Sequence, residues 1–161
     1  MTYKTSLDKT AMTTTIGVSV LFVIIIVLQY SIIKDAGSLI PFYTTTGCLL
    51  IYFLTFAFRP INYVVTQEEI IVRRPLVNVH IKRSDIESAE IIEREKIANS
   101  IRTFGVGGVF GYYGNFSNFS LGPMTWYATR KDRAVLITTL NKKKIILTPN
   151  DPDKLVSELN S

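Results

Sequence analysis

The side chains that carry most enzymatic chemistry are scarce in this sequence. It contains one histidine, His80, and one cysteine, Cys48, which falls within a long apolar run. A nucleophile, a base and an orienting group cannot be assembled around one histidine in an alternating, strand-like run. A single cysteine also excludes a disulfide framework and a metal site of the C-x-x-C type. The sequence therefore predicts a protein that is not an enzyme and that uses no cofactor and no metal.

A glycine-rich stretch runs from Phe104 to Gly122. Such a stretch can cradle a phosphate when it joins a strand to a helix and closes with Lys-Ser or Lys-Thr, but neither feature follows here. Two interpretations remain open: a tight, bulged loop whose aromatic rings pack under a sheet, or an aromatic tip that contacts the bilayer surface or a partner. The candidate aromatic contacts are Phe110, Tyr112, Tyr113, Phe116 and Phe119.

Two groups of basic residues flank one predicted hairpin and could form a single cationic edge. The candidate contacts for a lipid or a partner are Arg130, Lys131, Arg133, Lys142, Lys143 and Lys144. They are ordinary solvated turn charges in one interpretation and a contact for acidic phospholipid in the other. The formal net charge of +5 is too mild to indicate nucleic acid as a partner.

These candidate sites belong to a chain that begins with two long uncharged runs, residues 10–33 and 36–58. A helix of about 20 apolar residues crosses the hydrocarbon core of a bilayer. A signal peptide has a shorter apolar core, and one small domain could not bury two such helices in water. The sequence therefore predicts a transmembrane hairpin over residues 10–58, with spans at about 11–33 and 38–58 that are joined near Lys34-Asp35.

The flanking cations predict the orientation of this hairpin. Lys4 and Lys9 precede the first span and Arg59 follows the second, whereas Asp35 neutralises the lysine in the connection. Because Lys and Arg stay on the cytoplasmic side, both termini are expected in the cytoplasm at the inner membrane. Residues 1–9 form a short cytoplasmic N-terminus and residues 61–161 a cytoplasmic domain. Gln29 either snorkels to the outer interface or bonds to the other helix or a second copy.

The cytoplasmic segment is predicted to be mainly β. Alternating, β-branched runs predict strands at residues 62–66, 69–74, 77–82, 86–93, 125–130, 134–140 and 143–148. Asp151 is a suitable N-cap and Pro152 a suitable first residue for one C-terminal helix, whose apolar stripe can close one end of a sheet.

This arrangement of strands and one helix resembles the pleckstrin-homology (PH) domain. Five segments resemble the bacterial PH-domain family found on small membrane proteins: residues 65–74, 84–90, 104–114, 127–129 and 147–153. The resemblance covers about residues 62–159. It implies a mainly-β PH-like barrel or sandwich of about seven antiparallel strands, capped by one C-terminal helix. The predicted fold is therefore a two-helix transmembrane hairpin followed by this PH-like domain.

The resemblance leaves two functions open. One is a non-enzymatic, membrane-anchored module for protein–protein interaction or self-association at the inner face of the membrane. The alternative is binding or sensing of anionic lipid head groups through the basic edge and the aromatic stretch. PH domains that bind phosphoinositides use basic residues around their first hairpin, whereas the first turn here, Gln67-Glu68-Glu69, is acidic.

Overall fold

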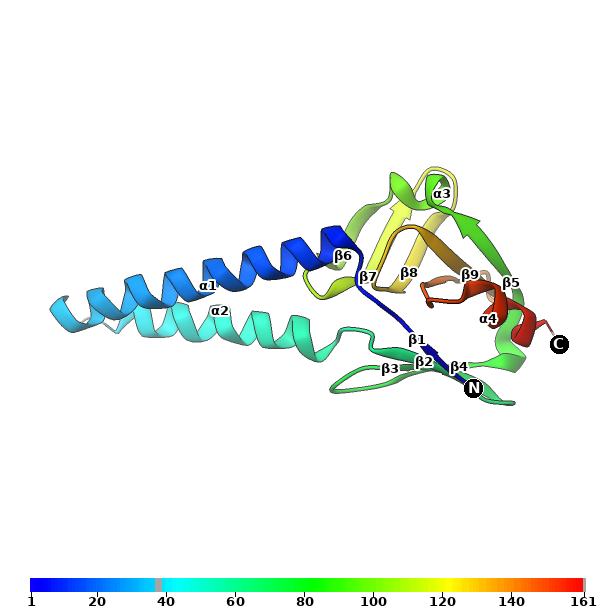
Figure 1. The fold of residues 1–161 in the computed structure, drawn as a ribbon, viewed down its shortest axis with the longest axis horizontal. Coiled ribbons are helices and arrows are strands. Elements are labelled where there is room, and N and C mark those ends of the chain that lie inside the picture. Colours follow the sequence, from blue (N-terminus) through cyan, green and yellow to red (C-terminus); the bar gives the residue numbers. More distant parts are fainter. Residues whose placement is uncertain (37–38, 161) are drawn as a thin grey trace.

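The computed structural model describes residues 1–36 and 39–160, with the side chains of residues 32–36 left out. Two long helices, α1 (Lys9–Ala36) and α2 (Ile40–Ala57), project side by side from one end of a β domain (Figure 1). By length and composition both could cross a membrane. Their large apolar side chains point outward on all sides, and Val23 and Leu28 are 60% and 61% exposed. A helix that is apolar all round belongs in an apolar environment.

Polar side chains join the two helices along their facing sides. The hydroxyl groups of Ser19 and Tyr52 lie 2.6 Å apart, and Thr45 donates a hydrogen bond to the Gln29 side-chain oxygen. Gln29 therefore bonds across to the other helix, as one of the two alternatives for it predicted. The predicted connection at Lys34-Asp35 falls within α1, and residues 37–38 lie outside the described part of the chain.

A four-stranded antiparallel sheet contains the segments on either side of the helices. Its order is β1-β2-β3-β4, with β1 at Thr2–Lys4, β2 at Asn62–Val65, β3 at Glu69–Arg73 and β4 at Val79–Lys82. Strand β1 pairs with β2, so the chain before α1 is joined to the chain after α2. The sequence predicted no strand before the first helix. This pairing attaches the start of α1 and the end of α2 to one sheet.

A six-stranded sheet faces the first one, in the order β5-β9-β10-β8-β7-β6. Its strands are β5 (Ile86–Glu93), β6 (Ile101–Gly108), β7 (Gly111–Asn118), β8 (Gly122–Ala128), β9 (Arg133–Thr139) and β10 (Lys144–Leu147). Strand β10 inserts between β9 and β8 and therefore runs parallel to β8. Short helical segments η1 (Arg83–Asp85) and α3 (Arg94–Ala98) flank β5.

Strand β9 shows how the core is organised, because both of its faces are buried. Val135 and Ile137 pack into a cluster between the two sheets, which the C-terminal helix α4 (Pro152–Leu159) closes through Leu155. Ala134 and Leu136 face a second cluster on the other side of the sheet, which includes Ala11 of α1. The start of α1 is thus part of the domain core.

Several predictions about this domain are confirmed and others are wrong. The Asp151 carboxylate accepts a hydrogen bond from the Lys154 backbone N–H, so the predicted cap of α4 is present. His80 lies exposed on β4, as predicted. The fold, however, has ten strands in the described residues instead of about seven, its β8–β10 pair is parallel, and its two sheets form no closed barrel. The stretch predicted as a bulged loop, Phe104 to Gly122, mostly forms β6 and β7.

Candidate functional site

The turn between β6 and β7 connects the β domain to both helices. Phe110, at the tip, has a left-handed backbone with φ of 57°. Its ring lies 5.3 Å from the ring of Tyr52 and 5.5 Å from that of Phe56, both on α2. Its backbone N–H donates to the Thr15 hydroxyl of α1 at 2.8 Å. A single residue therefore contacts both helices.

Two tyrosines of β7 extend this junction. The Tyr113 hydroxyl donates to the backbone carbonyl of Thr55 near the end of α2. The Tyr112 hydroxyl donates to the Asp8 carboxylate at 3.2 Å, and the same carboxylate accepts the Ala11 N–H at 2.7 Å at the start of α1. Burial and the neighbouring Asp8 raise the pKa of Tyr112, so it remains a neutral donor at physiological pH. The junction is thus fixed by directional bonds and by ring packing.

Close backbone approach explains why this hairpin is rich in glycine. Gly105 and Gly114 are opposite each other on β6 and β7, and both have positive φ, at 114° and 113°. A Cβ added to Gly114 would lie 2.8 Å from the Gly105 Cα and closer still to the Phe104 carbonyl oxygen. A side chain cannot occupy this space without moving the backbone. Here glycine permits the close contact of two strands, and it does not form a phosphate loop.

The five candidate aromatic residues consequently have different surroundings. Tyr112, Tyr113 and Phe116 are buried, and Phe116 stacks on Trp126 with ring centroids 4.4 Å apart. Phe110 packs against the helices, whereas Phe119, in the β7–β8 turn, is fully exposed. Four of these five rings therefore pack within the protein, and the fifth, Phe119, is presented to the outside. A contact between Phe119 and a partner stays a prediction.

The structure separates the two basic groups that the sequence placed beside one hairpin. Arg133 begins β9 and Lys142 follows its other end, and seven extended residues span roughly 20 Å. At the first end, Arg130 pairs with Asp132 and Arg133 with Asp153. The Lys131 ammonium lies 4.4 Å from the centre of the Tyr112 ring. These residues therefore do not form one continuous edge with residues 142–144.

At the other end of β9, two of the three lysines have partners. Lys142 forms an ion pair with Glu87 at 2.5 Å, and the Lys144 ammonium donates to the Leu121 carbonyl at 2.6 Å. The ammonium of Lys143 makes no hydrogen bond or ion pair with any residue that the structure describes. Lipid contact by any of the six basic residues remains a prediction.

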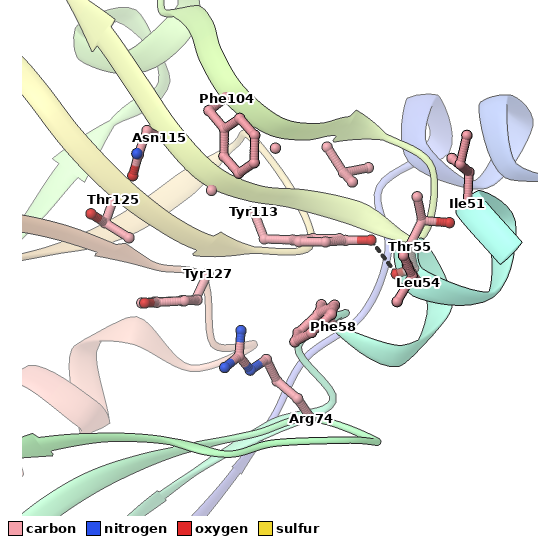
Figure 2. Close-up of a pocket in the computed structure, with 13 residues that line it drawn as sticks. Ile51, Leu54, Thr55, Phe58, Arg74, Phe104, Tyr113, Asn115, Thr125 and Tyr127 are labelled. Carbon is pink, nitrogen blue, oxygen red and sulfur yellow. Dashed lines mark hydrogen bonds between the residues drawn. The ribbon is translucent and has the colours of Figure 1, made fainter.

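A groove that no sequence pattern predicted opens between the end of α2 and the facing sheets. Its main cavity has a volume of about 540 Å³ and is lined by residues of α2, β6, β7 and β8, with Arg74 on one wall (Figure 2). A second cavity of about 390 Å³ adjoins it, because Thr125 and Tyr127 line both. Apolar pockets of several hundred Å³ with a few polar groups are typical of ligand sites.

Arg74 is the charged group of the main cavity. It directly follows β3, and its guanidinium lies 5.4 Å from the Phe58 ring centre and 5.7 Å from that of Tyr127 (Figure 2). Its Nε donates to the Val77 carbonyl at 2.6 Å. No carboxylate of the described chain pairs with it, and burial lowers its pKa while leaving it charged. In the sequence, Arg74 is one arginine before Pro75, and this pattern is too weak to predict a binding residue.

A mainly-β domain with two facing sheets and a C-terminal helix, preceded by two apolar helices, is the architecture expected of an anchored PH-like domain. Residues 61–161 match the family described as Bacterial PH domain, so this chain belongs to that family. The match begins after β1, which nevertheless completes the first sheet. Neither the curated proteins nor the solved structures include a significant match to this chain.

Proposed function

We propose that this chain is a non-enzymatic, membrane-anchored PH-like module that mediates protein contact or self-assembly at the inner face of the cytoplasmic membrane. Residues 10–58 form its anchor, residues 1–9 and 61–161 lie in the cytoplasm, and binding is its activity. The observation that carries the proposal is the docking of the β6–β7 turn against both helices through Phe110. This contact holds the domain in one orientation relative to the membrane.

The open edge of the six-stranded sheet offers a surface for a protein partner. Strand β6 pairs with β7 alone among the described strands, and it is eight residues long. Ile101 and Phe104 on this strand are 70% and 76% exposed. An exposed edge with apolar side chains can accept a further strand, with backbone hydrogen bonds giving affinity and side chains giving specificity. The partner is then another protein or a second copy of the chain.

Cysteine crosslinking in native membranes tests this proposal. Cys48→Ser first removes the natural thiol, after which Arg102→Cys places a thiol on β6 and Glu90→Cys places one on β5, the opposite edge of the same sheet. A bismaleimide reagent should give a discrete protein adduct with Arg102→Cys and little with Glu90→Cys. Equal labelling of the two thiols without an adduct at β6 would contradict partner binding at this edge.

Recognition of anionic head groups is the second candidate function. The position of Lys131 favours it, because this ammonium lies over Tyr112 beside the start of α1, where a leaflet surface would be. A cation near an anionic leaflet contributes about 1 kcal/mol of attraction. In full-length protein reconstituted in vesicles, anionic lipid should slow amide exchange at residues 129–133 and Lys131→Gln should abolish that effect. Unchanged exchange in the unsubstituted protein would remove this candidate.

A further inference from the structure

The groove beside α2 has an apolar part and a polar part. Figure 2 shows Leu54, Phe58 and the Tyr113 ring at the helix end of the cavity, and Asn115 and Thr125 at the other end. Ile51 and Leu54 belong to the same apolar helix that is proposed to cross the membrane. The apolar part therefore starts at the depth of lipid chains, and the polar part lies toward the cytoplasm.

Arg74 lies between these two parts without an anionic partner. The two terminal nitrogens of its guanidinium make no hydrogen bond to any residue within the described ranges. The Phe58 and Tyr127 rings, on either side, hold the group at the wall of the cavity. A half-buried guanidinium with two free donors is a suitable binding group for phosphate, which it can bind with two parallel hydrogen bonds.

We propose that the groove binds one anionic phospholipid from the inner leaflet. An acyl chain follows Leu54, Phe58 and Val106, and the phosphate bonds to the Arg74 guanidinium. This inference rests on the proposed membrane anchoring, but it is independent of a protein partner at the β6 edge.

The adjoining cavity has space for the part of the head group beyond the phosphate. Its lining includes the basic residues Lys82 and Lys143, the histidine His80 and one carboxylate, Asp85, and it meets the main cavity at Thr125 and Tyr127. Lys143 has no partner for its ammonium among the described side chains, as noted above. With two lysines against one carboxylate, the polar end of the groove has a small excess of positive charge, which suits a head group that carries negative charge beyond its phosphate ester.

The geometry favours a membrane lipid over a soluble ligand of the same charge. A water-soluble anion would gain nothing from the apolar wall that leads to Ile51, a side chain 63% exposed on the outside of α2. A phospholipid can place an acyl chain against that wall while part of the molecule stays in the leaflet, because the apolar end of the groove is continuous with the helix surface. It thus avoids most of the cost of transferring an acyl chain through water.

Photo-crosslinking of full-length protein in vesicles tests the site. The probe is phosphatidylglycerol with a photoactivatable group on its acyl chain, and phosphatidylcholine carrying the same group is the lipid control. We expect phosphatidylglycerol to label β6 and β7 near Val106 and Tyr113, in addition to α1 and α2. Arg74→Gln should reduce the β6–β7 labelling about tenfold, since a hydrogen-bonded charge is lost. The matched control is Arg73→Gln, which alters an exposed neighbour on β3 and should leave the labelling unchanged.

The outcomes separate this inference from the proposed function. Labelling confined to α1 and α2, or labelling of β6–β7 that is equal for both lipids and for both variants, would overturn the phospholipid site while leaving the anchor intact. Failure of all segments to label would instead show that the helices do not enter the bilayer, and it would overturn the anchoring too. Phosphatidylglycerol-specific labelling of Val106 that depends on Arg74 supports the site.

Discussion

Two hairpins of the six-stranded sheet, β6–β7 and β9–β10, have similar backbone features in their turns but very different surroundings. Each turn contains a non-glycine residue with positive φ: Phe110 at 57° and Lys142 at 59°. The Phe110 ring packs between aromatic rings of α2, whereas Lys142 makes an exposed ion pair with Glu87. The comparison indicates that the side chain at the tip, and not the shape of the turn, determines whether a hairpin packs against the helices.

The difference matters for function because it assigns different roles to the two sets of residues that the sequence singled out. The aromatic set mainly builds the junction between the two apolar helices and the β domain. The lysine set at residues 142–144 lies at the end of β9 away from Arg133 and is partly neutralised. Substitutions in the β6–β7 hairpin should therefore change the stability of the fold and the orientation of the β domain relative to the helices. Substitutions in the β9–β10 hairpin should leave both nearly unchanged.

Gly114→Ala should have the largest effect on stability, because it disrupts the close contact between β6 and β7. The new Cβ would overlap the Phe104 carbonyl oxygen at a backbone φ of 113°. Strain of this kind costs about 1–3 kcal/mol per residue, and the overlap adds to it, so the free energy of unfolding should fall by about 3 kcal/mol or more. Denaturant unfolding of the full chain in detergent, followed by fluorescence of the only tryptophan, Trp126, measures this.

The matched control for that substitution lies on the neighbouring strand. Gly107 has no positive φ, and a Cβ there would meet only the flexible Arg102 side chain at 3.5 Å. Gly107→Ala should therefore change stability by less than about 0.5 kcal/mol. If both variants unfolded at the same denaturant concentration, close strand approach would not be the reason for the glycine-rich composition.

The sequence predicted most of the β domain because its strands alternate with period two. That signal was absent from residues 104–122, where glycines replace the β-branched residues. The pairing there includes the close approach of Gly105 and Gly114, which no local pattern predicts. The signal was also absent from β1, whose three residues pair with a strand about 60 positions later. Short strands of this kind depend on long-range contacts that no local pattern reveals.

The candidate sites were less predictable than the fold. The basic groups are close in sequence, but β9 is extended and so places them at its opposite ends. The main cavity is assembled from α2, the residue that follows β3, and β6–β8, which are far apart along the chain. The charged residue of that cavity, Arg74, is in sequence like any arginine before a proline. Such a site appears only when the packing of the two sheets is known.

Phe110→Gly tests the contact between the tip of the β6–β7 hairpin and α2. Glycine relieves the left-handed strain but removes the ring that packs on Tyr52 and Phe56. Truncation of a buried phenylalanine costs about 3–5 kcal/mol, and the partial burial of this ring and the relieved strain should reduce the net loss to about 2 kcal/mol. Amide exchange at residues 108–111 should also accelerate. Phe119→Gly, at a fully exposed ring of the same stretch, should not accelerate it.

Lys142→Gly should have a smaller effect, in the opposite direction. The same relief of positive φ applies, but only an exposed ion pair with Glu87 is lost. Exposed pairs contribute about 0–1 kcal/mol, so the variant should gain about 0.5 kcal/mol in stability. The unfolding midpoint in the same detergent measures this gain. A loss as large as that of Phe110→Gly would show that the second hairpin is also held by tertiary contacts, and the contrast between the two turns would fail.

The smallest effect is expected from pH, at the Arg130–Asp132 pair near the start of β9. Although partial burial acts in the other direction, hydrogen bonds from Arg130 and from the backbone lower the pKa of Asp132. A carboxyl with a lowered folded pKa binds protons less well than in the unfolded chain. Its stabilisation is therefore present above the ordinary Asp pKa of about 4 and is lost as the pH falls through the folded value.

Because the Asp132 side chain is 48% exposed, solvent screening limits this contribution to less than about 1 kcal/mol. Asp132→Asn should therefore remove up to this amount from the free energy of unfolding at pH 7. It should also reduce, by the same amount, the loss of stability between about pH 5 and pH 3. Arg130→Gln should have the same effect, since it removes the main donor. Because no element of the β6–β7 junction includes this pair, exchange at residues 108–111 should stay slow in both variants. Faster exchange at residues 108–111 would mean that the start of β9 and the β6–β7 hairpin are energetically coupled. The junction would then include residues beyond those that contact the helices directly.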